Sequence, residues 1–401
     1  SNQSQILYKQ ALSPLHVDKG GDFVHVLNTN LWNRTDVVFL DSMVNLNEKE
    51  LITRTGEKVE TQRLYDGRWA FVAENIPALS SEVYQIVSKK KSSRRFVSMI
   101  AENKILNNGI VRVEIDEVKG TISSFKRVGD SYEYASNSGL NDYLYTGRYA
   151  SDPQGIEQIL NIRVLDDGAV AATLRIESKA PGCNTLWRDV TVYKGIDRVD
   201  ICNTLDKQDI LDFENVRFVF PFNIQQPEIT MDLAMSEIHP EREQLEGVNK
   251  HYYSLQNGLA VGDLEHAVCL TTVDAPFVEL GSPSGLDYRL NPRHGYGWWQ
   301  SAKISPIVYS WVMTNTWRTN YKASQGGTAK FRYSLQPCNP LDLKLKQRGA
   351  EREMELVAVA SRSSQNIEQL FRLKGRHRIA LSSIKPADDG KGYIVCLHNM
   401  G

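Results

Sequence analysis

The sequence predicts an almost entirely β protein built from several antiparallel sandwich domains. Two observations predict this fold class. Apolar and polar residues alternate with a period of two along many segments, and short turn signals separate those segments. No long stretch shows a convincing 3.6-residue period. Strands that follow one another through short turns pair in antiparallel sheets, and such sheets form sandwiches or barrels.

The alternation is clearest where one face of a strand is wholly apolar. Val111, Val113 and Ile115 fall on one face, whereas Arg112 and Glu114 fall on the other. A strand with one buried side and one solvent-facing side has this composition. Alternation recurs in three further segments, at residues 169–177, 216–222 and 331–335.

Glycine-containing pairs lie between these strands. Because glycine adopts positive φ without steric strain, such pairs are favoured in the tight turns of hairpins. They occur at Lys119-Gly120, Asp167-Gly168, Lys194-Gly195, Asn257-Gly258 and Asp389-Gly390.

Two breaks divide the chain into three predicted domains. Residues 88–95 are polar and basic, which is typical of a solvated linker or a long hairpin. Pro337 and Pro340 interrupt a strand pattern, because proline lacks the N–H that a strand ladder requires. A middle segment of about 240 residues is long for an immunoglobulin-like sandwich and suits a two-sheet supersandwich. The predicted domains are a small β-sandwich at 1–95, a supersandwich at 96–338 and a partial C-terminal β-sandwich at 339–401.

Composition limits the function classes. Hydrophobic residues make up 41% of the chain and charged residues 24%, as in globular proteins. The formal net charge is -1, from 47 basic and 48 acidic side chains. This balance argues against a nucleic-acid partner, whose phosphates favour a basic surface. No apolar run approaches the roughly 20 residues that a membrane-spanning helix needs.

The sequence offers no complete metal site. The five cysteines lack the close spacing of a zinc ribbon, and we expect buried free thiols. His16 and Asp18 would point the same way on a strand, but two ligands do not make a zinc site. We therefore assign no metal ligand and no cofactor to this chain.

A catalytic centre is equally hard to assign. The chain has no Gly-x-Ser-x-Gly elbow and no Gly-x-Gly-x-x-Gly loop ahead of a helix. Glycosidases use a pair of carboxylates, but the sequence does not say which pair shares a cleft. The eligible carboxylates are Asp142, Asp152, Glu157, Asp212, Glu214 and Asp287. No catalytic residue is assigned.

Two segments stand out because they combine aromatic rings with arginine and amides. They are residues 141–149 and the glycine-rich segment 291–300. Sugars present apolar C–H faces, which match aromatic rings, and hydroxyls, which match arginine, asparagine and aspartate. These two segments are the candidate carbohydrate contacts, and packing of their aromatics in a core or a domain interface is the alternative.

Several segments resemble one family in its domain order. Residues 101–125 resemble the opening of the large β domain of glycoside hydrolase family 38 α-mannosidases, a domain similar to the galactose-mutarotase supersandwich. Residues 311–335 resemble the end of that domain in a bacterial branch. Phe23 to Asp41 resemble the small sandwich that precedes it, and 382–390 resemble the start of the small C-terminal sandwich.

The resemblance implies an accessory, non-catalytic region of an α-mannosidase. It implies that a catalytic barrel upstream in the same polypeptide supplies the carboxylates and the zinc site, so the expected partners are that barrel and an α-mannoside glycan. The family's large β domain also lends an arginine and an aromatic to the edge of the active site. By resemblance Arg293 matches the arginine, and Tyr143 or Tyr145 matches the aromatic. The predicted substrate-binding residues are Arg293, Tyr143, Tyr145, Arg148, His294, Tyr296 and Trp298.

Two alternatives from other classes stay open. One is a stand-alone carbohydrate-binding protein that uses the two aromatic segments. The other is a mutarotase or lyase on the supersandwich, for which the candidates are His251, His266, Glu279 and Tyr252.

Overall fold

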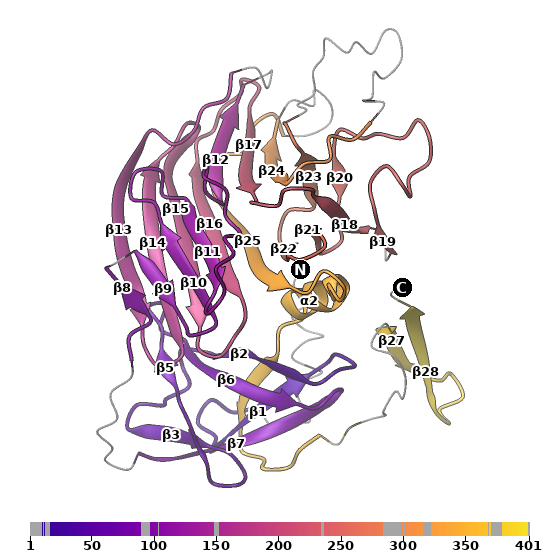
Figure 1. Cartoon of the computed structure of the whole chain (residues 1–401). Coiled ribbons are helices and arrows are strands. Elements are labelled where there is room, and N and C mark those ends of the chain that lie inside the picture. Colours follow the sequence, from indigo (N-terminus) through magenta and orange to yellow (C-terminus); the bar gives the residue numbers. More distant parts are fainter. Residues whose placement is uncertain are drawn as a thin grey trace. The chain divides into compact units, whose positions relative to one another are not determined.

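The computed structural model confirms the all-β fold class, with a small sandwich and a large multi-sheet β unit (Figure 1). It describes residues 10, 12, 17–89, 97–102, 104–147, 152–233, 236–283, 299, 301–315, 322–367, 369 and 379–399. Over these residues no helix is both long and apolar enough to cross a membrane. The chain divides into two compact units. The first comprises 1–98, 166–171 and 354–401, and the second comprises 99–165 and 172–353.

Two sheets make the sandwich of the first unit. One sheet has the strand order β26-β1-β7-β3-β4, and the other has the order β2-β6-β5. The strands of the first sheet are β26 (Val357–Ser361), β1 (Phe23–Asn28), β7 (Ser80–Ser88), β3 (Lys49–Ile52) and β4 (Lys58–Val59). The strands of the second are β2 (Arg34–Leu40), β6 (Trp69–Ile76) and β5 (Gln62–Arg63).

Strand β26 belongs to this first sheet although it lies far along the chain. It pairs antiparallel with β1, so that His25 lies opposite Val359. The core between the two sheets includes Val24, Val26 and Phe71, all fully buried. Residues from the predicted third domain thus complete a sheet of the first, while the predicted boundaries themselves stay a prediction. The hairpin β27 (Ile379–Pro386) and β28 (Tyr393–Asn399) forms a separate two-stranded sheet.

The second unit holds three sheets. The largest has nine strands in the order β13-β14-β15-β16-β25-β22-β21-β18-β19. These strands are β13 (Gln158–Asp167), β14 (Ala171–Lys179), β15 (Cys183–Tyr193), β16 (Val199–Lys207), β25 (Gly327–Cys338), β22 (Ala267–Thr272), β21 (Gly258–Gly262), β18 (Glu228–Leu233) and β19 (Ser236–Ile238).

The two smaller sheets have five and four strands. The five-stranded sheet contains, in order, β12 (Asp142–Thr146), β17 (Asn215–Pro221), β24 (Ile307–Thr314), β23 (Phe277–Leu280) and β20 (Tyr253–Ser254). The four-stranded sheet contains β11 (Ile122–Arg127), β10 (Val111–Ile115), β9 (Ile105–Asn107) and β8 (Ile100–Ala101).

One continuous apolar core joins the three sheets of the second unit. Phe218 and Phe220 of β17 contact Tyr333 of β25, with ring centroids 6.1 and 5.1 Å apart. Val113 of β10 belongs to the same core and is fully buried. The residues that the alternating pattern placed on apolar faces therefore build this core, because packed sheets bury their inward-facing side chains between them.

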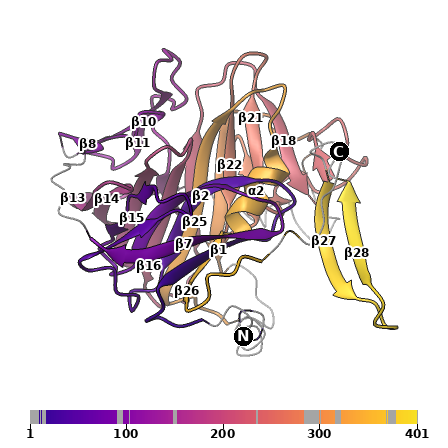
Figure 2. The same cartoon turned by 90° about the horizontal axis from the view of Figure 1, so that it is seen from below.

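Helix α2 (Leu345–Glu353) packs on strands β21 and β22 of the nine-stranded sheet, which Figure 2 shows from below. Leu345 is fully buried and joins a small cluster with Ala260 and Cys269. Lys346 lies 3.8 Å from the buried carboxylate of Asp232, so an ion pair supplements this apolar contact.

Candidate functional site

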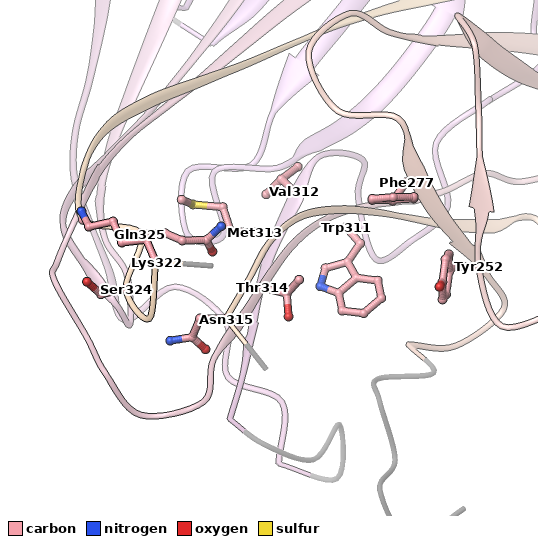
Figure 3. Close-up of a pocket in the computed structure, with 11 residues that line it drawn as sticks. Tyr252, Phe277, Trp311, Val312, Met313, Thr314, Asn315, Lys322, Ser324 and Gln325 are labelled. Carbon is pink, nitrogen blue, oxygen red and sulfur yellow. The ribbon is translucent and has the colours of Figure 1, made fainter. Parts of the chain in front are cut away.

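A pocket of about 720 Å³ opens in the second unit beside the end of β24 (Figure 3). This volume is in the range of small-molecule sites. Its lining changes character from one end to the other, because aromatic rings lie at one end and polar side chains at the other. The described residues that line it are Tyr252, Phe277, Trp311, Val312, Met313, Thr314, Asn315, Lys322, Ser324, Gln325 and Gly326.

Three neighbouring strands position the aromatic end. Trp311 lies on β24, Phe277 begins β23 and Tyr252 directly precedes β20. The Tyr252 ring packs edge-on against Phe277 and Trp311, with centroids 5.6 and 5.8 Å apart. Because the three strands are adjacent in one sheet, the rings form a continuous apolar wall.

A buried ion pair supports the wall from behind. The Arg217 guanidinium lies over the Trp311 ring, 4.8 Å from its centroid, and the two residues are partners in the β17–β24 register. Arg217 donates to both Glu279 oxygens, one of them at 3.2 Å, and to Thr146 Oγ1 at 3.3 Å. Arg217 and Glu279 are both fully buried, so the charge under the indole ring is balanced without solvent.

The indole N–H of Trp311 has no hydrogen-bond partner among the described residues. The side chain is only 6% exposed, and its nitrogen lies on the side of the ring that faces Thr314 and Asn315 (Figure 3). Buried N–H groups without partners are rare, since each forfeits the hydrogen bonds it made to water. This unused donor makes Trp311 a candidate contact for a ligand oxygen.

Asn315 organises the polar end of the pocket. Its Nδ2 donates to the carbonyl oxygens of Ile210, Asp212 and Ala323, at 3.2, 2.8 and 3.2 Å. Its Oδ1 accepts from the backbone N–H of Glu214 at 2.7 Å. These bonds occupy the donors and the acceptor of the Asn315 amide, so its role is to hold the shape of the pocket. Lys322 and Gln325 are the neighbouring polar side chains that are available for ligand contact.

We expect Asn315→Ala to lower the free energy of unfolding by about 2–3 kcal/mol, because three carbonyls and one N–H lose their partner. Urea unfolding of both variants measures the change. Asn184 is a matched control, since its amide makes one long, exposed bond of 3.3 Å to Asp206. An Asn315→Ala variant as stable as Asn184→Ala would contradict this role.

The predicted substrate-binding residues that the structure describes are Tyr143 and Tyr145 of β12. Tyr143 is fully buried in the core, and its hydroxyl donates to the Pro181 carbonyl at 2.6 Å. Tyr145 is half-buried, and burial and a hydrogen bond to Glu214 raise the pKa of its phenol. Tyr145 is thus the more accessible of the two. The others, Arg148, Arg293, His294, Tyr296 and Trp298, lie outside the described residues.

Glu214 connects Tyr145 to the pocket. Its carboxylate lies 2.7 Å from the ammonium group of Lys207, and both side chains are almost wholly buried. The backbone N–H of Glu214 also donates to Asn315 Oδ1, which lines the polar end of the pocket. The β12–β17 edge near Tyr145 and the polar end of the pocket therefore share one residue.

Of the residues weighed for mutarotase or lyase chemistry, Glu279 lies close enough to His251 for its charge to act on that imidazole, whereas His266 lies elsewhere. Glu279 is engaged by Arg217, and Tyr252 lines the pocket. His251 accepts the backbone N–H of Trp299 at 3.0 Å, and burial lowers the pKa of its imidazole. His266 stacks on Tyr132, with ring centroids 3.4 Å apart.

The carboxylates weighed for glycosidase chemistry are also scattered. Asp142 is half-buried, and loss of solvent raises the pKa of its carboxyl, while Glu214 is paired with Lys207. Asp152, Glu157 and Asp212 are exposed, and Asp287 is outside the described residues. Among the described residues no cluster of three metal-ligating side chains occurs. His16 falls outside them, and Asp18 bonds Gly20 and Arg362.

Sequence reasoning did not single out Trp311 and Arg217. Both sit in strands with ordinary apolar patterns, and Arg217 reads as a solvent-facing residue between Val216 and Phe218. The one signal in the sequence for Arg217 is that a charged residue stands in a strand that is otherwise apolar on both faces, which predicts a buried and paired charge.

Comparison with known proteins places the fold. No protein-family model and no curated protein sequence matches the chain. Among solved structures, an α-mannosidase from Enterococcus faecalis V583 matches 96% of this chain with a TM-score of 0.69 and 12% identity. A protein in glycosyl hydrolase family 38 from Enterococcus faecalis also matches 96%, with a TM-score of 0.64 and 11% identity.

The chain spans about half the length of these structures, 52% and 54% respectively. A galactose mutarotase-like protein from Lactobacillus casei ATCC 334 matches 61% of the chain over its own full length, with 12% identity and a TM-score of 0.34. The predicted resemblance to family 38 α-mannosidases is confirmed at the level of the fold: the chain has the fold of about half of such an enzyme.

Proposed function

We propose that this chain is an accessory, carbohydrate-contacting β region of an α-mannosidase-like glycoside hydrolase, and that the Trp311 pocket holds part of the sugar. The observation that carries the proposal is the indole N–H of Trp311, which lies in an aromatic-walled pocket and has no hydrogen-bond partner among the described residues. The fold likeness to family 38 α-mannosidases supports the enzyme class.

The pocket suits the two surfaces of a sugar. The rings of Tyr252, Phe277 and Trp311 offer an apolar wall for the C–H face of a pyranose. The Trp311 N–H donates to one hydroxyl or ring oxygen, and Lys322 and Gln325 at the other end supply further polar contacts. Arg217 stiffens the wall, because its guanidinium fixes the indole from the opposite face.

The chemistry of the parent enzyme belongs to a separate catalytic domain in this proposal. There, one carboxylate would attack the anomeric carbon and a second would protonate the leaving oxygen, and a bound zinc would supply Lewis-acid assistance. The residues of this chain orient the glycan and exclude water at the edge of that site. Tyr145, Arg148, Arg293, His294, Tyr296 and Trp298 stay proposed contacts. For Tyr143, which is fully buried, we propose a supporting role on the same strand as Tyr145.

An assay of this chain with an aryl α-mannoside separates contact from catalysis. We expect binding without zinc-dependent turnover from the chain alone, and turnover when it is joined to the catalytic domain of the same polypeptide. Clear zinc-dependent turnover by the isolated chain would overturn the non-catalytic role.

Replacing Trp311 with Phe tests the pocket itself. The substitution keeps an aromatic ring but removes the N–H donor, so we expect affinity for an α-mannoside to fall about tenfold, as loss of one buried hydrogen bond predicts. Isothermal calorimetry measures the affinity. Trp187→Phe is the matched control, because Trp187 lies on β15 and does not line the pocket. Equal affinity for both variants would remove Trp311 as a contact.

A stand-alone carbohydrate-binding protein is the second candidate, because the pocket requires no catalytic partner to bind a sugar. Binding to glycans that is lost in Tyr296→Ala and Trp298→Ala, without any gain in turnover on joining a catalytic domain, would favour it. Absence of binding to any glycan would count against both candidates.

A further inference from the structure

Two buried thiols face each other in the second unit. The Sγ atoms of Cys269 and Cys338 lie 3.4 Å apart, and the residues are 1% and 6% exposed. They belong to neighbouring strands, β22 and β25, of the nine-stranded sheet. All five cysteines lie in the part of the chain that the structure describes. Among them, Cys269 and Cys338 are the one pair whose sulfur atoms are in contact.

The strand register explains why the sulfurs meet. Cys338 is the direct partner of Ala267, and Cys269 lies two residues further along the same face of β22. The thiols are therefore diagonal neighbours across an antiparallel pair, and sheet twist brings one such diagonal together. An S–S bond is about 2.05 Å long, so each sulfur must move by less than about 1 Å to form one.

The two thiols share one apolar cluster, which also includes Ala260 and Leu345. Their electrostatic surroundings differ. The hydrogen bond between the thiols lowers the pKa of Cys338 and raises that of Cys269, and the Arg348 and Arg127 charges further favour the Cys338 thiolate. Since the thiolate is the nucleophile in thiol oxidation and Cys338 is the less buried of the two, we expect Cys338 to react first.

We propose that Cys269 and Cys338 form a reversible disulfide when the protein meets a peroxide. The Cys338 thiolate attacks one oxygen of hydrogen peroxide, the O–O bond breaks, and the hydroxide that leaves takes up a proton to form water. The product is a sulfenic acid on Cys338. The Cys269 thiol then loses its proton, its sulfur attacks the Cys338 sulfur, and the sulfenic oxygen leaves as a second water. Two thiols are oxidised by two electrons, and one peroxide is reduced to two waters.

The disulfide would link the C-terminal end of β25 to the neighbouring strand β22. Cys338 is the last residue of β25, and α2 follows a few residues later and packs on the same cluster. The bond closes a loop of 69 residues in the unfolded chain, which restricts the unfolded ensemble. We therefore expect the oxidised protein to unfold at a higher temperature than the reduced one.

Limited peroxide treatment of the full chain tests the proposal. We expect the intact mass to fall by about 2 Da, the loss of two hydrogens. Peptide mapping should locate one cross-link, between Cys269 and Cys338. Dithiothreitol should restore the mass, and the midpoint of thermal unfolding should rise by several degrees on oxidation. A first oxidation product that is a sulfinic acid, or a cross-link that includes another cysteine, would overturn the proposal, as would unchanged thiols.

Single substitutions separate the roles of the two sulfurs. Cys269→Ser leaves Cys338 without its partner, so we expect sulfenic acid that a dimedone probe labels at Cys338. Cys202→Ser is the matched control, because Cys202 is half-buried beside Thr204 and lies away from the pair. It should lose 2 Da like the natural chain, within about the same time. If Cys269→Ser does not fold, the peptide map of the natural chain still decides the outcome.

Discussion

Replacing Arg217 with Met is expected to lower the free energy of unfolding by about 3–5 kcal/mol, because it strands a buried carboxylate. The side chains of Arg217 and Glu279 are both fully buried, and the guanidinium donates to both Glu279 oxygens. Without Arg217, Glu279 must either stay charged in an apolar site or take up a proton, and both states are unfavourable. The urea midpoint, followed by near-ultraviolet circular dichroism, measures the loss.

Two controls make this prediction specific. The double variant Arg217→Met, Glu279→Leu removes both charges, so most of the lost stability should return. Arg332→Met breaks an exposed pair with Asp274, in which the side chains are 46% and 26% exposed, and should cost at most about 1 kcal/mol. A single Arg217→Met variant as stable as Arg332→Met would show that the buried pair does not hold the fold.

Truncating Tyr143 is expected to be about as damaging, at about 3–5 kcal/mol for Tyr143→Ala, since it leaves a large cavity in the core. The ring is fully buried and packs edge-on against Phe218, with centroids 6.0 Å apart. Tyr143→Phe removes only the hydroxyl that donates to Pro181, and we expect about 1–2 kcal/mol.

The same pair of variants tests what Tyr143 does for binding. Because the ring is buried, Tyr143→Phe should leave the affinity for an α-mannoside unchanged in calorimetry. Tyr145→Phe is the matched comparison, since Tyr145 is half-buried on the same strand. A binding loss in Tyr143→Phe that exceeds the loss in Tyr145→Phe would mean that Tyr143 contacts the ligand after all.

The strands were predictable because their signal is local. The apolar face of Val111, Val113 and Ile115 is buried in β10 as the alternation predicts. Among the predicted turn glycines, Gly120 and Gly195 have φ of 65° and 74°, the conformation for which glycine is favoured. Period-two alternation and positive φ depend on a few consecutive residues, so one sequence suffices to find them.

Helix α2 was not predicted because the side of the helix that is buried is not apolar. Its buried residues are Leu345, Lys346, Gly349 and Arg352, of which only the first is a large hydrophobe. Lys346 and Arg352 are buried against Asp232 and Asp200, carboxylates more than 100 residues earlier in the chain. A helix held by distant charges gives no hydrophobic period to detect.

The pocket was hidden for a related reason. Trp311 matters because Arg217 lies behind it and because its N–H has no partner in the part of the chain that the structure describes. Both facts depend on strand pairing. Glu279, which completes the support, is 62 residues from Arg217. Sequence composition directed attention to aromatic-rich segments instead, and one of those rings, Tyr143, is core.

The indole N–H signal of Trp311 is the most direct test of the central claim that this pocket receives a sugar. In a chain labelled with ¹⁵N-tryptophan, the signal is assigned by its absence in Trp311→Phe, and an α-mannoside that calorimetry shows to bind is titrated in. The pocket assignment predicts that the Trp311 N–H signal shifts with the same dissociation constant while that of Trp187 stays in place. A Trp311 signal that does not move at saturating ligand would contradict it.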